Sequence, residues 1–512
     1  MEGKNAIQLK NVTKRFGKVI ANDNINLSVK KGEILSILGE NGSGKTTLMN
    51  MISGIYFPDE GEIFIDGREV TICSPKDAFS LGIGMVHQHF KLINVLSAAE
   101  NIILGMPGSG MLNMEQVEKE IKELSDRYGF ELKPYQKIYD MSVSEKQTVE
   151  IIKVLYRGAD ILILDEPTAV LTPQETEKLF SVLRNMRDAG KSIIIITHKL
   201  NEVLELSDRV SVLRKGKYIG TVDTNKATVS SLTEMMVGEK VSLNIERNKP
   251  KNPVERLQIK NLTCINSDGI RTLNNVSLTA NGGEILGIAG IAGSGQKELL
   301  EAITGLQHLE GGSIIYKSTD GIDIELLGMK ASEIEKNGIK ISFVPEDRLG
   351  MGLVASMGMT DNMMLRSYNK ENSFFVDRKK PRELARSIIE KLSVVTPGTE
   401  TPVGRLSGGN VQKVLVGREI ANNPEILILA YPVRGLDINS SYTIYNLMNE
   451  QKKKGVAVIC VIEDLDVLIE LCDKIVVLNS GEVSGILDAR KTNKEEVGLL
   501  MTRHRMEELK DA

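Results

Sequence analysis

The stretch Gly39-Glu40-Asn41-Gly42-Ser43-Gly44-Lys45-Thr46 matches the phosphate-loop pattern, a glycine-rich turn that ends in lysine and threonine. It follows an apolar run at residues 34–38, which predicts a buried strand, a turn and then a helix that opens at Lys45. Glycines let backbone N–H groups point inward, and the helix N-terminus adds positive potential for phosphate oxygens. We expect Lys45 to reach the β- and γ-phosphates of a nucleotide, and Thr46 to hold Mg²⁺. The residues expected to contact the nucleotide here are Gly39, Glu40, Asn41, Gly42, Ser43, Gly44, Lys45, Thr46 and Thr47.

A second apolar run, residues 161–164, ends in two carboxylates, Asp165 and Glu166. Because four apolar residues precede the acids, both are expected at the carboxyl end of a buried strand, where ligands bind in parallel α/β sheets. Asp165 suits the Mg²⁺ shell, and Glu166 can polarise an attacking water molecule. The two motifs together predict an α/β domain that binds and hydrolyses ATP.

The chain repeats its own architecture. Residues 7–12 (IQLKNV) recur as residues 257–262 (LQIKNL). Positions 142, 165 and 198 find their counterparts 265 residues later, at 407, 430 and 463. A fixed offset across separate motifs indicates a duplicated domain. We therefore predict one domain at residues 1–243 and a second at 257–512. The linker between them, residues 244–256, is polar and contains two prolines, so it is expected to be exposed.

The second copy has lost the chemistry of the first. Its phosphate loop reads Gly290-Ile291-Ala292-Gly293-Ser294-Gly295-Gln296-Lys297, so that glutamine replaces Lys45 and lysine replaces Thr46. Its counterpart strand, residues 426–429, ends in Ala430-Tyr431 instead of two carboxylates. A site without the lysine and both acids is not expected to hydrolyse ATP.

On these motifs the chain resembles a tandem ATP-binding-cassette ATPase over nearly its whole length. The resemblance implies two α/β domains, each a P-loop, RecA-like core with an antiparallel β-subdomain and an α-helical subdomain. Residues 115–128 show apolar residues at helical spacing, which places the helical subdomain of the first copy within residues 114–157.

The resemblance also assigns roles in the first copy. Gln88 matches the glutamine that touches the metal and senses the membrane partner, so the implied metal contacts are Thr46, Gln88 and Asp165. His198 matches the switch histidine at the γ-phosphate, which makes Glu166 and His198 the implied catalytic pair. Phe16 matches the aromatic residue that stacks on adenine.

In the second copy these positions differ. The adenine position falls on Asn266 or Ser267, neither of which is aromatic. Glu346 stands at the position of Gln88, and Glu463 at that of His198.

Cassettes of this family pair head to tail, so that each ATP lies between one phosphate loop and the partner's signature motif. The second copy has the clean signature, Leu406 to Asn410, whereas residues 142–145 of the first copy read Ser-Val-Ser-Glu. Asp437 matches an aspartate that reaches across the interface, and its counterpart in the first copy is Thr172. Every loss thus falls on one composite site. The resemblance implies that the competent site, which binds ATP and Mg²⁺, is completed by Ser407, Gly408, Gly409, Asn410 and Asp437.

Composition and charge limit the function. The net charge of −4 argues against a nucleic-acid partner, and no stretch approaches the roughly 20 apolar residues of a membrane helix. The four cysteines show no disulfide or metal-ligand spacing. Among tandem cassettes, the strings at residues 82–90 (GIGMVHQHF), 165–175 (DEPTAVLTPQE) and 345–348 (PEDR) resemble ATPase subunits of importers for nucleosides or simple sugars, with the first string closer to the nucleoside branch.

The importer resemblance implies two integral-membrane permease subunits, an extracytoplasmic substrate-binding protein, and a peripheral location on the cytoplasmic face of the plasma membrane. An importer of ribose or galactose is the alternative. A soluble tandem cassette that acts on ribosomes or DNA is a distant alternative, because this linker is short and such translation factors keep two good nucleotide sites.

Overall fold

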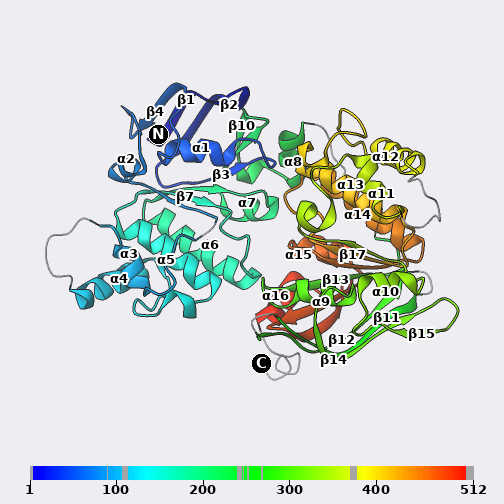
Figure 1. Cartoon of the computed structure of the whole chain (residues 1–512). Coiled ribbons are helices and arrows are strands. Elements are labelled where there is room, and N and C mark those ends of the chain that lie inside the picture. Colours follow the sequence, from blue (N-terminus) through cyan, green and yellow to red (C-terminus); the bar gives the residue numbers. More distant parts are fainter. Residues whose placement is uncertain are drawn as a thin grey trace. The chain divides into compact units, whose positions relative to one another are not determined.

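A computed structural model describes residues 4–88, 90–106, 113–238, 245, 247–250, 253–266, 269–368 and 377–502. The chain folds as two compact units, residues 1–242 and 243–512, which we call unit 1 and unit 2 (Figure 1). Each unit is described by itself below.

Unit 1 is built on one mixed β-sheet. Its strands are β1 (Asn5–Phe16), β2 (Val19–Lys30), β3 (Ile34–Leu38), β4 (Glu60–Ile65), β5 (Arg68–Val70), β6 (Ile83–Val86), β7 (Ile161–Asp165), β8 (Ser192–Ile196), β9 (Arg209–Arg214) and β10 (Lys217–Asp223). The strand order is β5-β4-β1-β2-β10-β9-β3-β8-β7-β6. Strands β6, β7, β8, β3 and β9 pair in parallel, whereas β1 pairs antiparallel with β2 and β4. The parallel strands form the predicted α/β core, and the antiparallel strands form the predicted β-subdomain.

The parallel strands are mostly apolar because both of their faces are buried. In β7, Ile161 and Ile163 belong to one core cluster, and Leu162 and Leu164 belong to the cluster on the opposite face. Successive side chains of a strand point to opposite faces. A strand that lies between two cores therefore buries nearly all of its side chains, and apolar residues are favoured at most of its positions. The chain turns polar only at Asp165, where the strand ends. This is why the acids lie at the edge of the sheet.

Helices cover the sheet of unit 1. They are α1 (Lys45–Ile52), α2 (Pro75–Ser80), α3 (Ala98–Ile103), α4 (Met114–Tyr128), α5 (Val143–Tyr156), α6 (Pro173–Asp188), α7 (Leu200–Leu206) and α8 (Val229–Val237). In Figure 1, α3, α4 and α5 gather on the side away from the blue antiparallel strands, so the predicted helical subdomain is present. The apolar side chains of α4, including Val117 and Ile121, enter the same core as those of α5.

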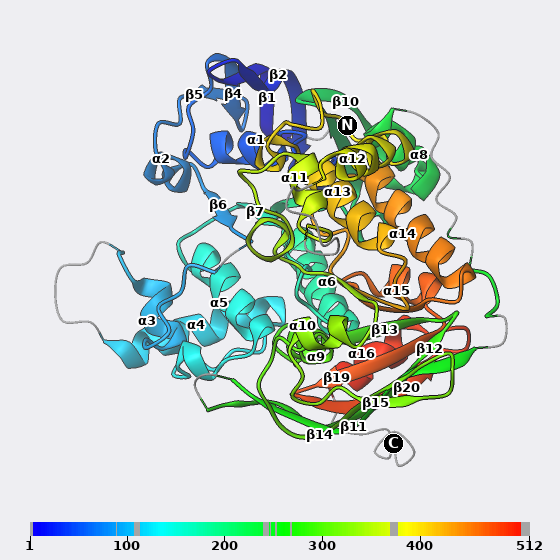
Figure 2. The same ribbon diagram turned by 45° about the vertical axis from the view of Figure 1, so that its right-hand side comes forward.

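Unit 2 repeats this plan. Its strands are β11 (Val254–Ile265), β12 (Arg271–Gly282), β13 (Ile285–Gly290), β14 (Leu309–Lys317), β15 (Asp323–Glu325), β16 (Ile341–Val344), β17 (Ile426–Ala430), β18 (Ala457–Val461), β19 (Lys474–Asn479) and β20 (Glu482–Asp488). They form one sheet of order β16-β17-β18-β13-β19-β20 and another of order β12-β11-β14-β15. The helices are α9 (Gln296–Ile303), α10 (Ala331–Lys336), α11 (Met359–Met364), α12 (Lys379–Lys391), α13 (Gly408–Ala421), α14 (Ile438–Lys453), α15 (Leu465–Leu471) and α16 (Lys494–Thr502). Figure 2 shows α11, α12 and α13 on one side of the parallel strands and β11, β12, β14 and β15 on the other.

The segment before β11 is anchored on unit 2. Ile245 is 8% exposed and belongs to a core cluster of that unit. The guanidinium of Arg247 donates to the carbonyls of Ile469 and Cys472, both at 2.7 Å. The expectation of an exposed linker is therefore wrong at Ile245, because burial of an isoleucine side chain is favourable even inside a polar segment. Strand β11 begins at Val254, which is three residues before the predicted start of the second domain.

Two expectations about composition can be compared with the structure. All four cysteines are free, and three are buried, while Cys73 is exposed. In the ranges that the structure describes, no helix has both the length and the hydropathy that crossing a bilayer requires.

Candidate functional site

The phosphate loop of unit 1 lies between β3 and α1. The helix begins at Lys45, as the sequence predicts. Gly44 has φ of 97°, and a Cβ at this position would lie 2.4 Å from the carbonyl oxygen of Ala21. Only glycine combines that dihedral angle with so close an approach of two backbones. The loop is thus held in place by the neighbouring β2, so its N–H groups can be fixed before a ligand arrives.

Lys45 is buried inside this loop, with 7% of its surface exposed. Its ammonium group donates to the carbonyls of Gly39 at 2.6 Å and Glu40 at 3.0 Å. Burial lowers the pKa of Lys45, while Glu166 and Asp165 act in the opposite direction. A cation held among carbonyls in a partly desolvated loop is suited to phosphate oxygens.

The two acids at the end of β7 differ in their surroundings and in their backbone conformation. Burial, followed by the charge of Glu166, raises the pKa of Asp165 to about 6, while Lys45 opposes this shift. Glu166 has φ of 49°, a left-handed conformation that costs roughly 1–3 kcal/mol for a residue with a side chain. Its N–H donates to the carbonyl of Ile196 at the end of β8, at 2.9 Å. This strained turn directs Glu166 away from the course of the strand.

The two implied catalytic side chains touch each other. Nδ1 of His198 lies 2.8 Å from Oε1 of Glu166. The hydrogen bond with Glu166 raises the pKa of His198. Since β7 and β8 are neighbours and Asp165 pairs with Ile196, the residues that follow both strands meet at one edge of the sheet. The motifs predicted each residue separately, and the structure brings them together.

The residues of this edge fit a nucleotide with Mg²⁺. Ser43 Oγ and Glu166 Oε2 are buried and have no hydrogen-bond partner within the described part of the chain. An unpaired buried polar atom is unfavourable, and phosphate oxygens or metal-bound water would satisfy it. Thr46 and Gln88 are exposed at the same edge, Gln88 two residues beyond β6. In the described ranges no three His, Cys, Asp or Glu side chains gather as a metal cage, and Mg²⁺ commonly binds through one or two carboxylates plus substrate phosphates.

Phe16 lies at the end of β1 and is 44% exposed. Its ring meets that of Tyr56 edge to face, with 5.2 Å between the centroids. Lys14 ties this strand end to the facing turn through Asp59 at 2.9 Å. Tyr56 was missed from the sequence, although an aromatic residue just after the phosphate-loop helix was the available signal. At the corresponding place in unit 2, Asn266 Oδ1 accepts a hydrogen bond from the N–H of Ile270, and Ser267 lies outside the described residues.

A second group missed from the sequence fixes the loop that follows β7. The ammonium group of Lys199 donates to the carbonyl of Thr168 at 3.1 Å and to Glu202 at 2.9 Å. The hydroxyl of Thr168 also donates to Glu202. These contacts join the loop after Glu166 to the segment after His198.

The second phosphate loop keeps its shape without its chemistry. Gly295 has the same φ as Gly44, 97°. Gln296 is buried, and its Nε2 donates to the carbonyl of Ile291 at 3.0 Å. Gln296 and Ile291 stand at the positions of Lys45 and Glu40, so the same contact is made by an uncharged group. Tyr431 occupies the strained position of Glu166, with φ of 48°. The second copy has therefore kept the backbone conformation of both turns, although the side chains expected to act in hydrolysis have been replaced.

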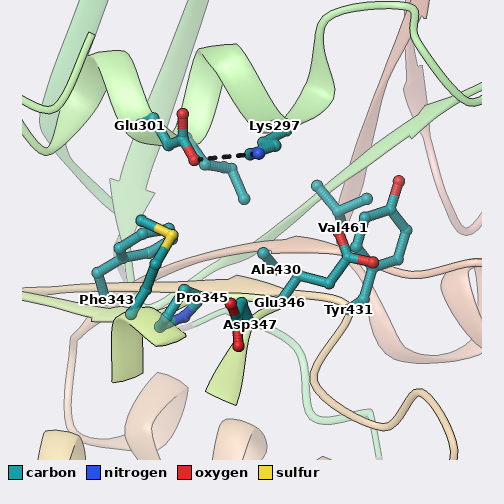
Figure 3. Close-up of a pocket in the computed structure, with 11 residues that line it drawn as sticks. Lys297, Glu301, Phe343, Pro345, Glu346, Asp347, Ala430, Tyr431 and Val461 are labelled. Atoms are coloured by element: carbon teal, nitrogen blue, oxygen red, sulfur yellow. Dashed lines mark ion pairs between the residues drawn. The ribbon is translucent and has the colours of Figure 1, made fainter. Parts of the chain in front are cut away.

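A pocket of about 280 Å³ lies at this position in unit 2. Lys297 and Glu301 of α9 form one wall and pair at 3.8 Å, and Glu346 and Tyr431 lie on the other wall (Figure 3). The remaining lining is mainly apolar, and includes Phe343. Gln296 replaces the lysine of the phosphate loop, and Ala430 replaces the expected metal carboxylate, so this site lacks the charges that unit 1 offers to a triphosphate and its metal.

The two signature segments begin helices in both units. Ser142 caps α5 in a closed box, because its hydroxyl accepts from the N–H of Glu145 while the Glu145 carboxylate accepts from the N–H of Ser142. Ser407 caps α13, and its hydroxyl also accepts from Nδ2 of Asn410 at 2.9 Å. Gly408 and Gly409 follow at the start of the helix. The first N–H groups of a helix have no partner within the helix and can bind an anion.

Thr172 and Asp437 are both helix caps. Thr172 caps α6 through Glu175. Asp437 caps α14, where its carboxylate accepts from the N–H of Ser440 at 2.8 Å and from its hydroxyl at 2.7 Å. The sequence suggested only a role across an interface, and the structure adds a local one.

Two segments of the chain, residues 22–169 and 273–433, match the ABC transporter family. The chain belongs to this family. The nucleoside import ATP-binding protein NupA of Lactococcus lactis subsp. cremoris is 43% identical over 98% of this chain and 99% of its own length. The guanosine import ATP-binding protein NupO of Bacillus subtilis is 43% identical over 97% of each chain. The ribose import ATP-binding protein RbsA of Yersinia pestis bv. Antiqua is 36% identical over 97% of this chain and 96% of its own.

One matched segment falls in each unit and contains that unit's phosphate loop. The predicted tandem ABC fold is therefore confirmed. The roles of individual site residues remain predictions from motif and geometry.

The raised pKa of Asp165 leads to a prediction for stability. The pKa of this carboxyl is about 6 in the folded chain, against an ordinary value of 3.8. The folded state therefore binds the proton more tightly, and this stabilises the fold fully below pH 3.8. The stabilisation is lost as the pH rises through about 6. Asp165→Asn removes the penalty. We expect the nucleotide-free variant to exceed the parent's free energy of unfolding by about 1 kcal/mol near pH 8, after allowance for partial exposure, and to match it below about pH 4.

Calorimetric melting of both chains across this pH range measures the difference. Asp160→Asn, at a side chain that is 78% exposed, controls for the loss of one carboxylate elsewhere in unit 1. A gain for Asp165→Asn that stayed constant at every pH would contradict the assigned cause.

Proposed function

We propose that this chain is the ATP-hydrolysing subunit of an importer for nucleosides. ATP hydrolysis is the part that the geometry supports. The observation that carries it is the convergence of Lys45, Asp165 and the Glu166–His198 pair at one edge of the unit 1 sheet. Coupling to import follows from the family and from the relatives, which are ATP-binding subunits of importers.

Hydrolysis takes place at one composite site. Unit 1 supplies the phosphate loop, Mg²⁺ contacts through Thr46, Gln88 and Asp165, and the catalytic pair. Unit 2 supplies Ser407, Gly408, Gly409 and Asn410, with Asp437 adjoining them. The free N–H groups at the start of α13 and the dipole of that helix then face the γ-phosphate. When bound, Mg²⁺ neutralises charge that develops on the phosphates.

The residues divide the chemical work. Glu166 accepts a hydrogen bond from the attacking water and polarises it, while His198 orients the carboxylate through their hydrogen bond. Lys45 holds the β- and γ-phosphates, and Phe16 stacks on the adenine with its ring steadied by Tyr56. Closure of the two units around ATP and their reopening after hydrolysis transmit motion through Gln88 to two integral-membrane permease subunits. The chain thereby works peripherally, at the cytoplasmic face of the membrane, with an extracytoplasmic binding protein as the source of substrate.

Nucleosides are the proposed cargo because the relatives with the higher identity, 43%, carry nucleoside and guanosine names. Import of ribose is the second candidate, which the relative at 36% identity supports. The test is ATPase activity of the chain reconstituted in vesicles with the permease and binding proteins that co-purify with it. We expect purine nucleosides to stimulate hydrolysis severalfold, and Lys45→Ala to remove the stimulation.

Ribose at equal concentration is the comparison in the same vesicles. Stimulation by ribose with no response to nucleosides would replace the proposed cargo by a simple sugar. Co-purification with ribosomes instead of membrane proteins would reject the importer assignment.

A further inference from the structure

The segment Pro345-Glu346-Asp347-Arg348 follows β16 in unit 2, and none of its residues is among those assigned above to ATP binding or hydrolysis. Its side chains are nevertheless organised. One carboxylate oxygen of Asp347 accepts from the N–H groups of Leu349 at 3.3 Å and Gly350 at 2.8 Å, which fixes the turn. With the turn fixed, Glu346 and Arg348 are both directed toward the loop that follows β17.

Arg434 in that loop joins the two acidic replacements of unit 2. Its guanidinium pairs with Glu346, and its Nε lies 3.1 Å from a carboxylate oxygen of Glu463. Glu346 and Glu463 stand at the positions of Gln88 and His198 in the first copy. The losses in this site are therefore matched by a new ion-pair network that links the end of β16, the loop after β17 and the segment after β18.

Arg348 extends the network to the signature. Its guanidinium donates to the backbone carbonyl of Arg434 and, at 3.4 Å, to the carbonyl of Gly408. Gly408 is the first residue of α13, and Arg434 lies three residues before Asp437. A Cβ built on Gly409 would lie 3.4 Å from a carboxylate oxygen of Asp437, so the two segments are in contact next to Arg348. The arginine thus spans the groups that unit 2 contributes to the proposed composite site.

Unit 1 lacks these charges at the corresponding positions. Ala169 stands where unit 2 has Arg434, and Phe90 where it has Arg348. There the loop after β7 is held by Lys199 and Glu202 instead, on the side of the catalytic pair. In unit 1 this loop is also joined to the signature helix, because Nε2 of Gln147 in α5 donates to the carbonyl of Pro167 at 2.6 Å. The arginine that contacts the signature carbonyl is particular to unit 2.

We propose that Arg348 is a positioning residue for ATP hydrolysis. Held beside the Glu346–Arg434–Glu463 network, it sets the spacing between the signature turn at Gly408 and the loop that leads to Asp437. The inference rests on the proposed composite site, because only there do these segments meet the nucleotide bound by unit 1. The degenerate site then serves as a fixed support for the competent one.

The test compares Arg348→Ala, Arg348→Lys and Arg386→Ala in the assembled importer. Arg386 is exposed on α12 and controls for the loss of one positive charge from unit 2. We expect Arg348→Ala to lower kcat about tenfold while KM for ATP changes less than about twofold, since unit 1 binds the nucleotide. Arg348→Lys should recover little, because the two carbonyls are bound by two different nitrogens of a rigid planar guanidinium, and a flexible point charge does not fix their spacing. Arg386→Ala should match the parent.

Melting temperature and Ser407→Arg complete the design. An equal melting temperature for Arg348→Ala and Arg386→Ala, with the loss confined to kcat, supports positioning. Full recovery by Arg348→Lys, a parental kcat in Arg348→Ala, or a fall in melting temperature that accounts for the loss would overturn it. Loss of hydrolysis in Ser407→Arg beside a parental Arg348→Ala rejects this inference alone, whereas parental hydrolysis in Ser407→Arg rejects the composite site itself.

Discussion

Lys45→Ala is expected to lower ATP hydrolysis by the assembled importer at least about 1000-fold and to stop transport, because the phosphate charge loses its principal cation. Gln296→Ala, at the corresponding position of unit 2, is expected to leave both rates within about twofold of the parent. The difference follows from what each side chain does. The ammonium group of Lys45 lies among carbonyls that a phosphate can replace, whereas the Gln296 amide makes one uncharged contact with Ile291.

Steady-state ATPase rates and uptake into vesicles measure both variants side by side. Because Gln296 is buried, its replacement also needs a melting curve, so that a loss of folded protein is not read as a loss of catalysis. Gln296→Lys is a further control. It restores the cation of the second loop, but Ala430 and Tyr431 still replace both acids, so the rate should not increase. Equal losses in Lys45→Ala and in well-folded Gln296→Ala would show that the second site is required for turnover.

The parts of the site that could be predicted are those fixed by short stretches of chain. The phosphate loop and the Asp165–Glu166 strand end each depend on local pattern, since a strand buried on both faces has to be apolar and its first polar residues mark its edge. The helix that opens at Lys45 and the strand that ends at Asp165 lie where these patterns place them.

What could not be predicted depends on side chains from distant segments. His198 and Glu166 are 32 residues apart in sequence, and their contact arises because β7 and β8 happen to be neighbours in the sheet. The edge-to-face contact of Tyr56 with Phe16 has the same origin, because the turn after α1 returns beside β1. The burial of Ile245 was not predicted, because the polarity of the linker was judged over the whole segment. A single apolar side chain in a polar segment can still pack into a core, as Ile245 does.

The ion-pair network of unit 2 is another feature that could not be predicted from the sequence. From the sequence, Glu346 and Glu463 are only losses, since each replaces a residue with a catalytic role. Their meaning as partners of Arg434 appears when three strand ends are brought together by the parallel order β16-β17-β18. A degenerate site can therefore be an ordered structural element.

The head-to-tail pairing makes the most demanding prediction, because it connects residues far apart in the chain. Ser407→Arg and Gly408→Asp are expected to lower ATP hydrolysis about 100-fold or more, although neither residue belongs to the unit that carries Lys45. Arginine at the cap of α13 adds bulk where the two units are proposed to close on ATP. Aspartate places a negative charge at a helix N-terminus that is expected to face the γ-phosphate.

The matched changes, Ser142→Arg and Val143→Asp, lie at the start of α5. In the proposed pairing they face the degenerate site, so they should cost less than about tenfold. Their rates have to be measured in the complex with the proposed membrane partners. Binding of ATP to the phosphate loop of unit 1 should survive in all four variants, because none removes a contact with Lys45. If hydrolysis proved more sensitive to Ser142 and Val143 than to Ser407 and Gly408, unit 1 would be using its own signature or that of another chain. The pairing proposed for these two units would then be wrong.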